Sequence, residues 1–193
     1  ETILESKPDV IVTFKGHIDK IYDELIKIAP VIQLDFSDTW QNTTIQCAKI
    51  VGKEELANQY IQETEEIINK TREQMSAYKN QTFALLRVDG KGNFVAPGYS
   101  NTLYYDQTVG FDLSKPKGYP EGSEVLSLEA LSEMNPDYII FRHYIDVAQA
   151  AVETHASSAV WQSLNAVKND RILFFDDSLN TESPLAIRLA SEK

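Results

Sequence analysis

The sequence has one cysteine, Cys47, which is too few thiols for a disulfide or a zinc cluster within one chain. Its longest apolar runs, such as residues 10–12 and 139–141, have only the length of a strand, well short of the roughly 20 residues that cross a bilayer. Basic residues are scarce, since 18 Lys and Arg stand against 29 scattered Asp and Glu, for a net charge of -11. This balance disfavours general binding to nucleic acids or anionic membranes.

The sequence also lacks the common motifs of nucleotide-binding and hydrolytic enzymes. Gly90 and Gly92 lie in a turn-like DGKG stretch and Gly16 is isolated, so neither GxGxxG nor a P-loop is present. There is no GxSxG nucleophile elbow, and the pair His143 and Asp146 has no evident nucleophile beside it. We keep an intracellular α/β-fold enzyme of unknown reaction as the alternative function.

The composition is that of an ordinary globular protein. Of its 193 residues, 42% are hydrophobic and 24% charged, which excludes a disordered or collagen-like chain. The length suits one large domain, or one domain with a partial neighbour. The chain starts at Glu1, without Met and without a leader segment, and we therefore expect a piece of a longer or processed protein.

Hydrophobic periodicity predicts strands that alternate with helices, the pattern of an α/β protein with a sheet covered on both faces. Asp38 is expected to cap a helix that Gly52 ends. The Gly-, Pro- and Tyr-rich segment 97–122 is expected to be a functional loop. The predicted strands are 9–14, 31–36, 83–88, 94–96, 138–141 and 171–175, and the predicted helices are 18–28, 38–50, 57–78, 102–109, 127–134, 147–152, 160–166 and 184–190.

The helix of about 25 residues that ends near Tyr78 is the most regular element, with apolar residues on one face and Glu, Gln, Asn and Lys opposite. It is either a core helix packed on a sheet or a spine between two lobes. A repeat favours two lobes: Glu1 precedes Pro8-Asp9 and a strand by the same spacing with which Glu129 precedes Pro136-Asp137 and a strand.

These stretches resemble the iron-siderophore and cobalamin substrate-binding proteins of bacterial ABC importers. The matching stretches are 7–12 (KPDVIV), 28–31 (IAPV), 50–57 (IVGKEELA), 127–140 and 161–172. The resemblance implies a three-layer, Rossmann-like α/β lobe with a mostly parallel sheet, a long interdomain helix and a partial N-terminal α/β lobe. Residues 1–36 would be the remnant of the first lobe, 37–79 the helical linker and 80–193 the second lobe.

The same resemblance implies a protein of iron transport that binds a ferric siderophore between two lobes and delivers it to the membrane permease, without catalysis. It would be extracytoplasmic, either a periplasmic binding protein or a lipoprotein whose signal peptide and lipid-bearing Cys are missing here. Cys47 lies in a predicted helix and is expected to be a small buried residue instead of that anchor. With its first lobe incomplete, this fragment is expected to bind ligand weakly or not at all.

Ferric siderophores surround their iron with oxygen atoms, so no metal ligands and no cofactor are expected from the protein. The ligand would need cations and aromatic walls, and Arg142 is the strongest candidate because it directly follows a strand. A solvated charge at the rim is the alternative for Arg142, and cover for the sheet is the alternative for the tyrosines. The candidates are Lys15, Arg87, Tyr99, Tyr104, Tyr105, Arg142, His143 and Tyr144.

The resemblance further implies one acidic permease contact on each lobe, at Glu1 and Glu129, where the alternative is an acid favoured by a helix dipole. No nucleic-acid partner is expected, and contact with a membrane only through the missing lipid anchor. Residues 176–180 (DDSLN) lack the aromatic residue often found there in the family. The kind of siderophore therefore stays open.

Overall fold

The computed structural model describes residues 2–98, 102–175 and 183–192. The chain divides into two compact units, Glu1–Ile61 and Gln62–Lys193, and the long helix α4 (Glu54–Met75) crosses the boundary. We treat each unit by itself. The finer division into segments 1–36, 37–79 and 80–193 stays a prediction.

The first unit contains two parallel strands, β1 (Ile11–Phe14) and β2 (Val31–Leu34), with Ile11 beside Val31. Its helices are α1 (Thr2–Glu5), α2 (Tyr22–Leu25), α3 (Trp40–Val51) and the start of α4.

Two details of the first unit differ from the sequence prediction. Helix α2 is shorter than the predicted 18–28. The cap of α3 is Thr39, whose side chain accepts from the main-chain N–H of Asn42, instead of Asp38. Asp38 binds the side-chain amides of Asn42 and Gln46, so it braces the first turns of α3 from outside. Gly52 ends α3 in the left-handed conformation, as predicted.

A five-stranded sheet forms the centre of the second unit, in the order β5-β4-β3-β6-β7. Strands β3, β6 and β7 are parallel, whereas β4 runs antiparallel to β3 and to β5. This confirms the predicted α/β lobe. The sequence allows either a hairpin or a strand followed by a loop around the DGKG turn, and the structure has the hairpin. The strands are β3 (Phe83–Val88), β4 (Phe94–Ala96), β5 (Glu124–Leu126), β6 (Tyr138–Phe141) and β7 (Ile172–Phe174). Strand β5 was not predicted, because only Leu126 of its three residues is buried.

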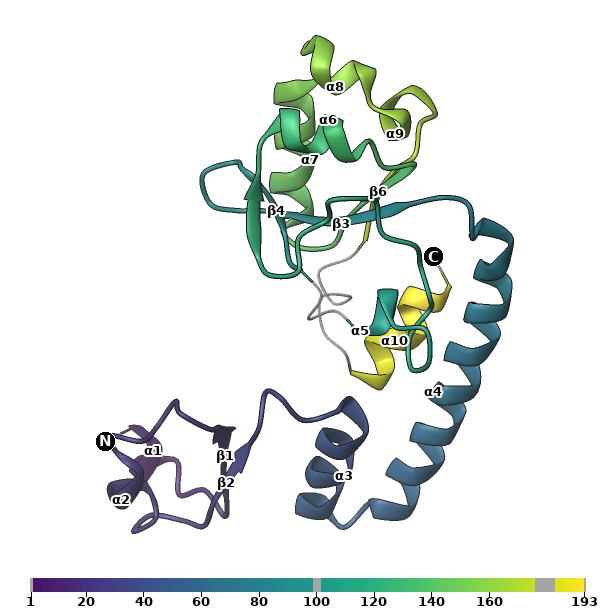
Figure 1. The fold of residues 1–193 in the computed structure, drawn as a ribbon. Coiled ribbons are helices and arrows are strands. Elements are labelled where there is room, and N and C mark those ends of the chain that lie inside the picture. Colours follow the sequence, from purple (N-terminus) through teal and green to yellow (C-terminus); the bar gives the residue numbers. More distant parts are fainter. Residues whose placement is uncertain (1, 99–101, 176–182, 193) are drawn as a thin grey trace. The chain divides into compact units, whose positions relative to one another are not determined.

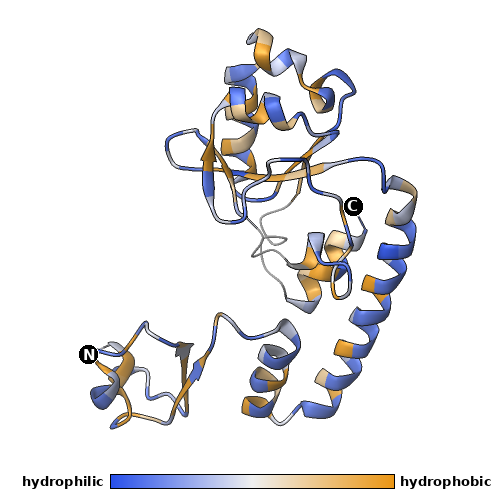
Figure 2. Ribbon diagram, in the orientation of Figure 1, coloured by the Kyte–Doolittle hydropathy of each residue, from blue (hydrophilic) through white to orange (hydrophobic). Residues whose placement is uncertain are grey.

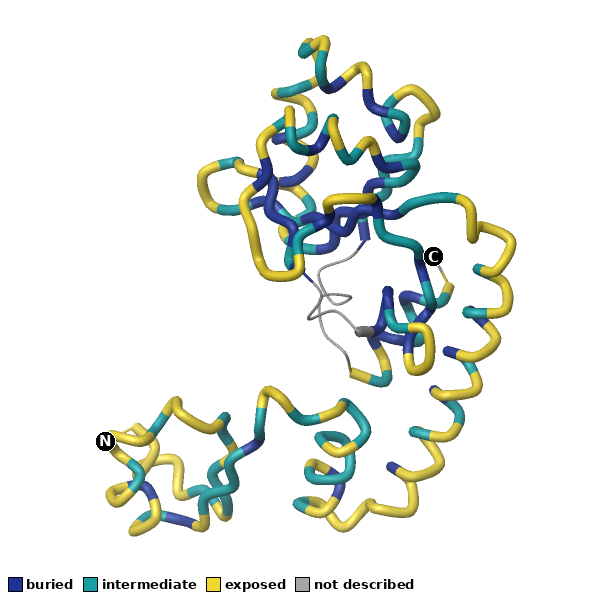
Figure 3. The backbone as a smooth tube through the Cα atoms, viewed as in Figure 1, coloured by how far each residue is buried: buried dark blue, intermediate teal, exposed yellow. Residues whose placement is uncertain are grey.

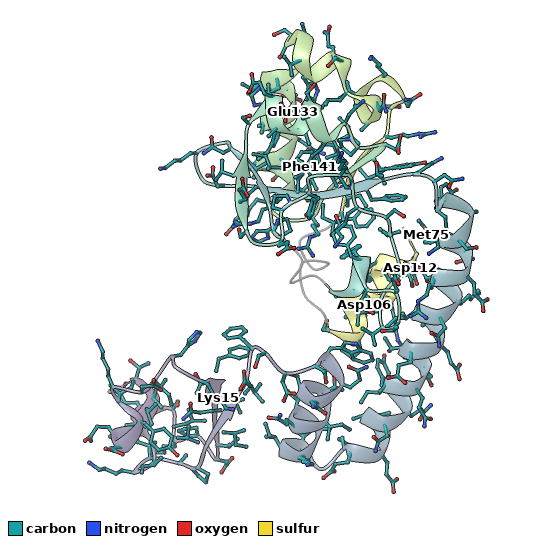
Figure 4. The ribbon with its side chains drawn as sticks, viewed as in Figure 1. Lys15, Met75, Asp106, Asp112, Glu133 and Phe141 are labelled. Carbon is teal, nitrogen blue, oxygen red and sulfur yellow. The ribbon has the colours of Figure 1, made fainter. Side chains whose placement is uncertain are left out.

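Helices cover both faces of this sheet (Figure 1). One layer holds α6 (Leu128–Met134), α7 (Ile145–His155), α8 (Ala159–Ser163) and α9 (Asn165–Lys168). The other holds α5 (Thr102–Tyr105), α10 (Pro184–Ser191) and the last turns of α4, which continue as a short 3-10 helix, η1 (Ser76–Tyr78). Figure 4 shows Glu133 of α6 and Met75 of α4 on opposite sides of the strand that carries Phe141. The segment predicted as one helix, 160–166, forms the two short helices α8 and α9, which separate at Leu164.

The middle strands β3 and β6 form the core of the second unit (Figure 3). Ala84, Leu85 and Leu86 of β3 are completely buried, as are Ile139 and Phe141 of β6. A parallel strand that is covered on both faces needs apolar residues at successive positions, which explains these unbroken apolar runs (Figure 2).

Helix α4 has one buried stripe within the second unit, formed by Thr64, Ile68 and Thr71. Arg188 of α10 donates to the hydroxyl of Thr64 and, at 2.9 Å, to the carboxylate of Glu63. Helix α4 is thus a core helix of the second unit, and it also continues into the first unit.

Gly98 is the point where the two ends of the segment 97–122 meet. Its φ is +80°, and a Cβ atom there would lie 2.6 Å from the carbonyl oxygen of Glu121 and from the main-chain carbon of Gly122. Both features require glycine at this position.

We expect Gly98→Ala to destabilise the second unit by about 1–3 kcal/mol, because the backbone of residues 121–122 must shift and the left-handed φ must be kept. Denaturant unfolding followed by circular dichroism measures the change. Gly90→Ala is the matched control, since nothing lies within 4 Å of a Cβ at Gly90. Equal stability of both variants would contradict the argument.

Candidate ligand-binding site

Two arginines lie side by side at the carboxyl ends of the central strands. Phe83 and Leu86 of β3 lie beside Tyr138 and Phe141 of β6, and one further residue in this register places Arg87 beside Arg142. The N–H of Arg142 donates to the carbonyl of Leu86 at 3.3 Å, which keeps the register at this point. Since side chains alternate along a strand, both arginines project from the face that α4, α5 and α10 cover. We call Arg87 and Arg142 the arginine pair.

The two members of the arginine pair differ in exposure. Arg87 is half-buried, whereas Arg142 is only 4% exposed, so the alternative of a solvated rim charge for Arg142 is wrong. The guanidinium of Arg142 lies over the ring of Tyr104, 5.4 Å from its centroid. Burial lowers the pKa of Arg142, and interactions with Tyr104, Tyr119 and Tyr105 oppose this shift.

Tyr105 and Tyr119 bind the main chain of β3 along the edge where β4 does not reach. The hydroxyl of Tyr105 donates to the carbonyl of Phe83 at 2.9 Å and accepts from the N–H of Leu85 at 3.1 Å. The hydroxyl of Tyr119 donates to the carbonyl of Leu85 at 2.8 Å. Burial raises the pKa of Tyr119 to about 12, and burial also raises the pKa of Tyr105 well above its usual value. Both phenols are therefore neutral donors at physiological pH.

His143 and Tyr144 follow Arg142 and lead to the start of α7. Tyr144 precedes α7 in the left-handed conformation, with φ of 51°, and its side chain is 53% exposed. Its ring lies 3.8 Å from that of the half-buried His143. A non-glycine residue in this conformation is uncommon outside functional sites and turns. Tyr144 thus presents an exposed aromatic ring near the buried Arg142.

Two residues that the sequence did not single out belong to the same region. Tyr119 is one, and Lys115 is the other, with its ammonium group 5.5 Å from the ring centroid of Tyr105. Burial lowers the pKa of Lys115. Both lie in the loop predicted to be functional, but no local pattern distinguishes them from Lys117 or Tyr104, so only the fold could identify them.

The remaining predicted site residues lie elsewhere. Lys15 is in the first unit, exposed, and forms an ion pair with Asp35 at 2.8 Å. The hydrogen bond to Asp35 raises the pKa of Lys15 and holds that of the Asp35 carboxyl well below its usual range. Glu129 is exposed in the first turn of α6. Glu1 and Tyr99 lie outside the described residues.

Cys47 is exposed on α3, so the prediction that it is buried is wrong. The inward position of this turn is occupied by its neighbour Ala48, which is 7% exposed. A residue one position along a helix points about a quarter-turn or more away, which places the thiol outside.

The second unit also contains a mostly apolar cavity of about 380 Å³. It lies between α4, α10 and the sheet, and Tyr104 contributes to its wall, whereas neither Arg142 nor Tyr144 does. Its lining includes Thr71, Met75, Tyr78, Phe83, Phe111, Tyr138, Ile140, Phe175 and Ser191.

Within the part of the chain that the structure describes, no group of three or more His, Cys, Asp or Glu side chains converges on a point that could hold a metal ion. None of the described helices is both long and apolar enough to span a membrane.

Helices cover both faces of a mixed sheet, and cations and aromatic rings lie at the carboxyl ends of its parallel strands β3 and β6. This arrangement is typical of a solute-binding α/β protein. Comparison with known proteins gives the family. The chain belongs to the periplasmic binding protein family, whose model matches residues 1–179. This is a family of solute-binding proteins and not of enzymes.

Among curated proteins, the chain is 29% identical over 195 residues to the Iron-uptake system-binding protein of Bacillus subtilis and 26% identical over 180 residues to its Fe(3+)-citrate-binding protein YfmC. These matches cover 96% and 89% of this chain. The chain spans 59% and 55% of the length of these two relatives.

Among solved structures, the chain matches the Iron-uptake system-binding protein FeuA of Bacillus subtilis with a TM-score of 0.82 and 26% identity, over 100% of this chain and 74% of FeuA. A structure of FeuA as triscatecholate siderophore binding protein, complexed with Ferri-Bacillibactin, matches with a TM-score of 0.72, also at 26% identity, over 99% of this chain and 70% of that one.

We expect Tyr105→Phe to destabilise the second unit by about 1–3 kcal/mol, because the buried N–H of Leu85 and carbonyl of Phe83 lose their shared partner. The amide of Leu85 should also exchange with solvent faster, which NMR measures directly. Tyr78→Phe is the control, because Tyr78 is 42% exposed. Unchanged protection of the Leu85 amide would show that the hydroxyl of Tyr105 does not support β3.

Proposed function

We propose that this chain is the substrate-binding component of an ABC importer, which binds a ferric siderophore and delivers it to the membrane permease. The observation that carries the proposal is the arginine pair at the carboxyl ends of β3 and β6, with the exposed Tyr144 two residues beyond Arg142 in the chain. Membership of the periplasmic binding protein family supports it, and so do relatives whose names state iron uptake and ferric citrate binding.

The residues of the site have separate roles in this proposal. Tyr144 offers its ring to the organic shell of the chelate, with His143 behind it. Arg87 is half-buried and can hydrogen-bond chelate oxygens with its planar guanidinium. Arg142 adds a buried positive charge at the end of β6. The iron would keep its oxygen ligands from the siderophore, so the protein contributes no metal ligand and no cofactor.

The other predicted ligand residues fit less well or rest on the sequence alone. Tyr104 and Tyr105 are 2% and 7% exposed, so they support the site from beneath instead of lining it. Lys15 remains a candidate in the first unit, where a ligand would have to compete with Asp35 for its ammonium group. Tyr99 remains a candidate from the sequence.

Docking to the permease is proposed at Glu129, together with Glu1. The carboxylate of Glu129 is exposed, and exposed acids that meet basic residues of a partner give orientation and fast, salt-sensitive association. We further propose an extracytoplasmic location, as a periplasmic protein or a membrane-anchored lipoprotein, which two relatives named as lipoproteins support.

In a longer protein with a complete first lobe, of which we expect this chain to be a piece, ferric citrate or Ferri-Bacillibactin should bind in titrations of tryptophan fluorescence. There, Tyr144→Ala should weaken this binding by about tenfold through loss of aromatic contact. Tyr78→Ala is the matched control, since Tyr78 is also an exposed tyrosine but belongs to the cavity wall. If no ferric complex binds to that longer protein without substitutions, the proposed function is wrong.

We expect Glu129→Arg to leave the affinity for the ferric complex unchanged but to reduce iron uptake by about tenfold, since the reversed charge would repel basic groups of the permease. Uptake of radiolabelled iron by cells that carry the importer measures this. Glu133→Arg, at an exposed position of the same helix, is the control. A loss of ligand affinity with normal uptake would contradict the docking role.

A further inference from the structure

We propose that the cavity between α4, α10 and the sheet is a second ligand site, which takes a neutral aromatic molecule of one or two rings. This site is separate from the arginine pair, because neither Arg87 nor Arg142 contributes to its wall. The inference goes beyond the proposed function, and its test uses no ferric complex.

The cavity has the size of a small-molecule pocket. Its volume of about 380 Å³ lies within the range of about 300–1,000 Å³ that is typical of ligand pockets. Apolar cavities of about 150 Å³ already bind benzene. An empty cavity lowers stability in proportion to its volume, because the atoms of its wall lose contacts that denser packing would give them. A cavity of this size therefore favours an occupant.

Aromatic rings form much of the wall, in two groups. Phe83 stacks on Tyr138 with ring centroids 4.7 Å apart, and Tyr78 meets Tyr138 edge to face. Tyr104 meets Phe111 edge to face, with centroids 5.8 Å apart. Aromatic rings attract one another in offset-stacked and edge-to-face arrangements, so a further ring placed between these groups gains contacts of the same kind. The wall thus favours an aromatic occupant.

Polar groups lie at the mouth of the cavity and apolar groups at its floor. The exposed members of the wall are Gln74, Tyr78 and Glu192, whereas Ile140 and Phe111 on the inner side are each 3% exposed. Glu192 is the one charged residue among the described residues of the wall. A charged molecule would have to leave water for an apolar floor, and Glu192 would also repel an anion. A neutral molecule therefore fits this cavity best.

The part of the wall that contains Phe111 is anchored to the end of α4. Arg72 of α4 donates to the carbonyl of Gly110 at 2.8 Å, and Lys79 forms an ion pair with Asp112. Phe111 therefore has a fixed neighbour on each side in the chain. Such anchoring keeps the segment from collapsing into the cavity, so the space is formed before a ligand enters, as in most small-molecule sites.

Indole and two charged derivatives of it test the inference. We expect the chain of 193 residues to bind indole with a dissociation constant of about 1 mM or below. Indoleacetate and tryptamine should bind at least about tenfold more weakly, because their charges must lose water. NMR of methyl groups follows the binding. The signals of Leu113 and Ile140 in the wall should shift, whereas those of Leu131, which is buried in the other helical layer, should not.

Ala190→Leu tests the position of the site. Ala190 lines the cavity from α10, so a leucine there extends into the empty space. We expect this variant to bind indole at least about tenfold more weakly and to raise the Tm by about 2–4 °C. Ala186→Leu is the matched control. Ala186 is one turn earlier on the same helix and 3% exposed, and it does not line the cavity, so overpacking should lower the Tm.

Three results would each overturn the inference: indole leaves the signals of Leu113 and Ile140 unchanged, the three probes bind equally well, or Ala190→Leu lowers the Tm as Ala186→Leu does. The inference also falls if indole binds to this chain but not to a longer protein in which further residues occupy the cavity. The probes contain no iron, so such a result leaves the proposed function standing. Failure to bind a ferric complex would likewise leave this inference standing.

Discussion

The second unit depends on how strand β3 satisfies its main-chain hydrogen bonds. On one edge, β3 pairs with β6 along its length, but on the other edge β4 pairs only with Arg87 and Val88. The remaining groups of that edge are buried and would cost free energy if left unpaired. The phenols of Tyr105 and Tyr119 and the carbonyl of Ser114 complete them, so side chains and a loop replace the missing half of a strand.

This arrangement links the stability of the sheet to the candidate site. The segment that supplies Tyr105 and Tyr119 bonds the main chain of β3 at Phe83 and Leu85. The neighbour of Tyr105, Tyr104, lies against the guanidinium of Arg142. Arg72 of α4 keeps another part of this loop in place by donating to the carbonyls of Thr108 and Gly110. The same segment therefore closes the edge of the sheet and contacts a buried cation. A long loop that appears irregular in sequence is in fact well anchored at several points.

The site combines features that oppose each other energetically. Arg87 and Arg142 follow each other in the register of neighbouring strands, Arg142 is buried, and Tyr144 holds a left-handed backbone conformation two residues beyond it. Each feature costs stability, and the apolar core of β3, β6 and α7 offsets this cost. Such concentrations of unfavourable terms are typical of binding sites, since a ligand can relieve them. The separate cavity between α4 and α10 shows none of these charges among its wall residues from the sheet.

Residue order alone was enough to predict the elements whose residues carry their own signal. Unbroken apolar runs gave β3 and β6, period-3.6 spacing gave α4, and Gly52 gave the end of α3, because each depends on neighbours along the chain. It also pointed to Arg87, Arg142 and Tyr144 by their position after or within strands. Only the tertiary structure decided that Arg87 and Arg142 share one face in register, that Tyr105 supports β3, and that Lys115 and Tyr119 join them. These relations arise between residues 10 or more positions apart, as the contacts of Tyr105 with Leu85 and with Lys115 illustrate, and no local pattern of residue types encodes such pairings.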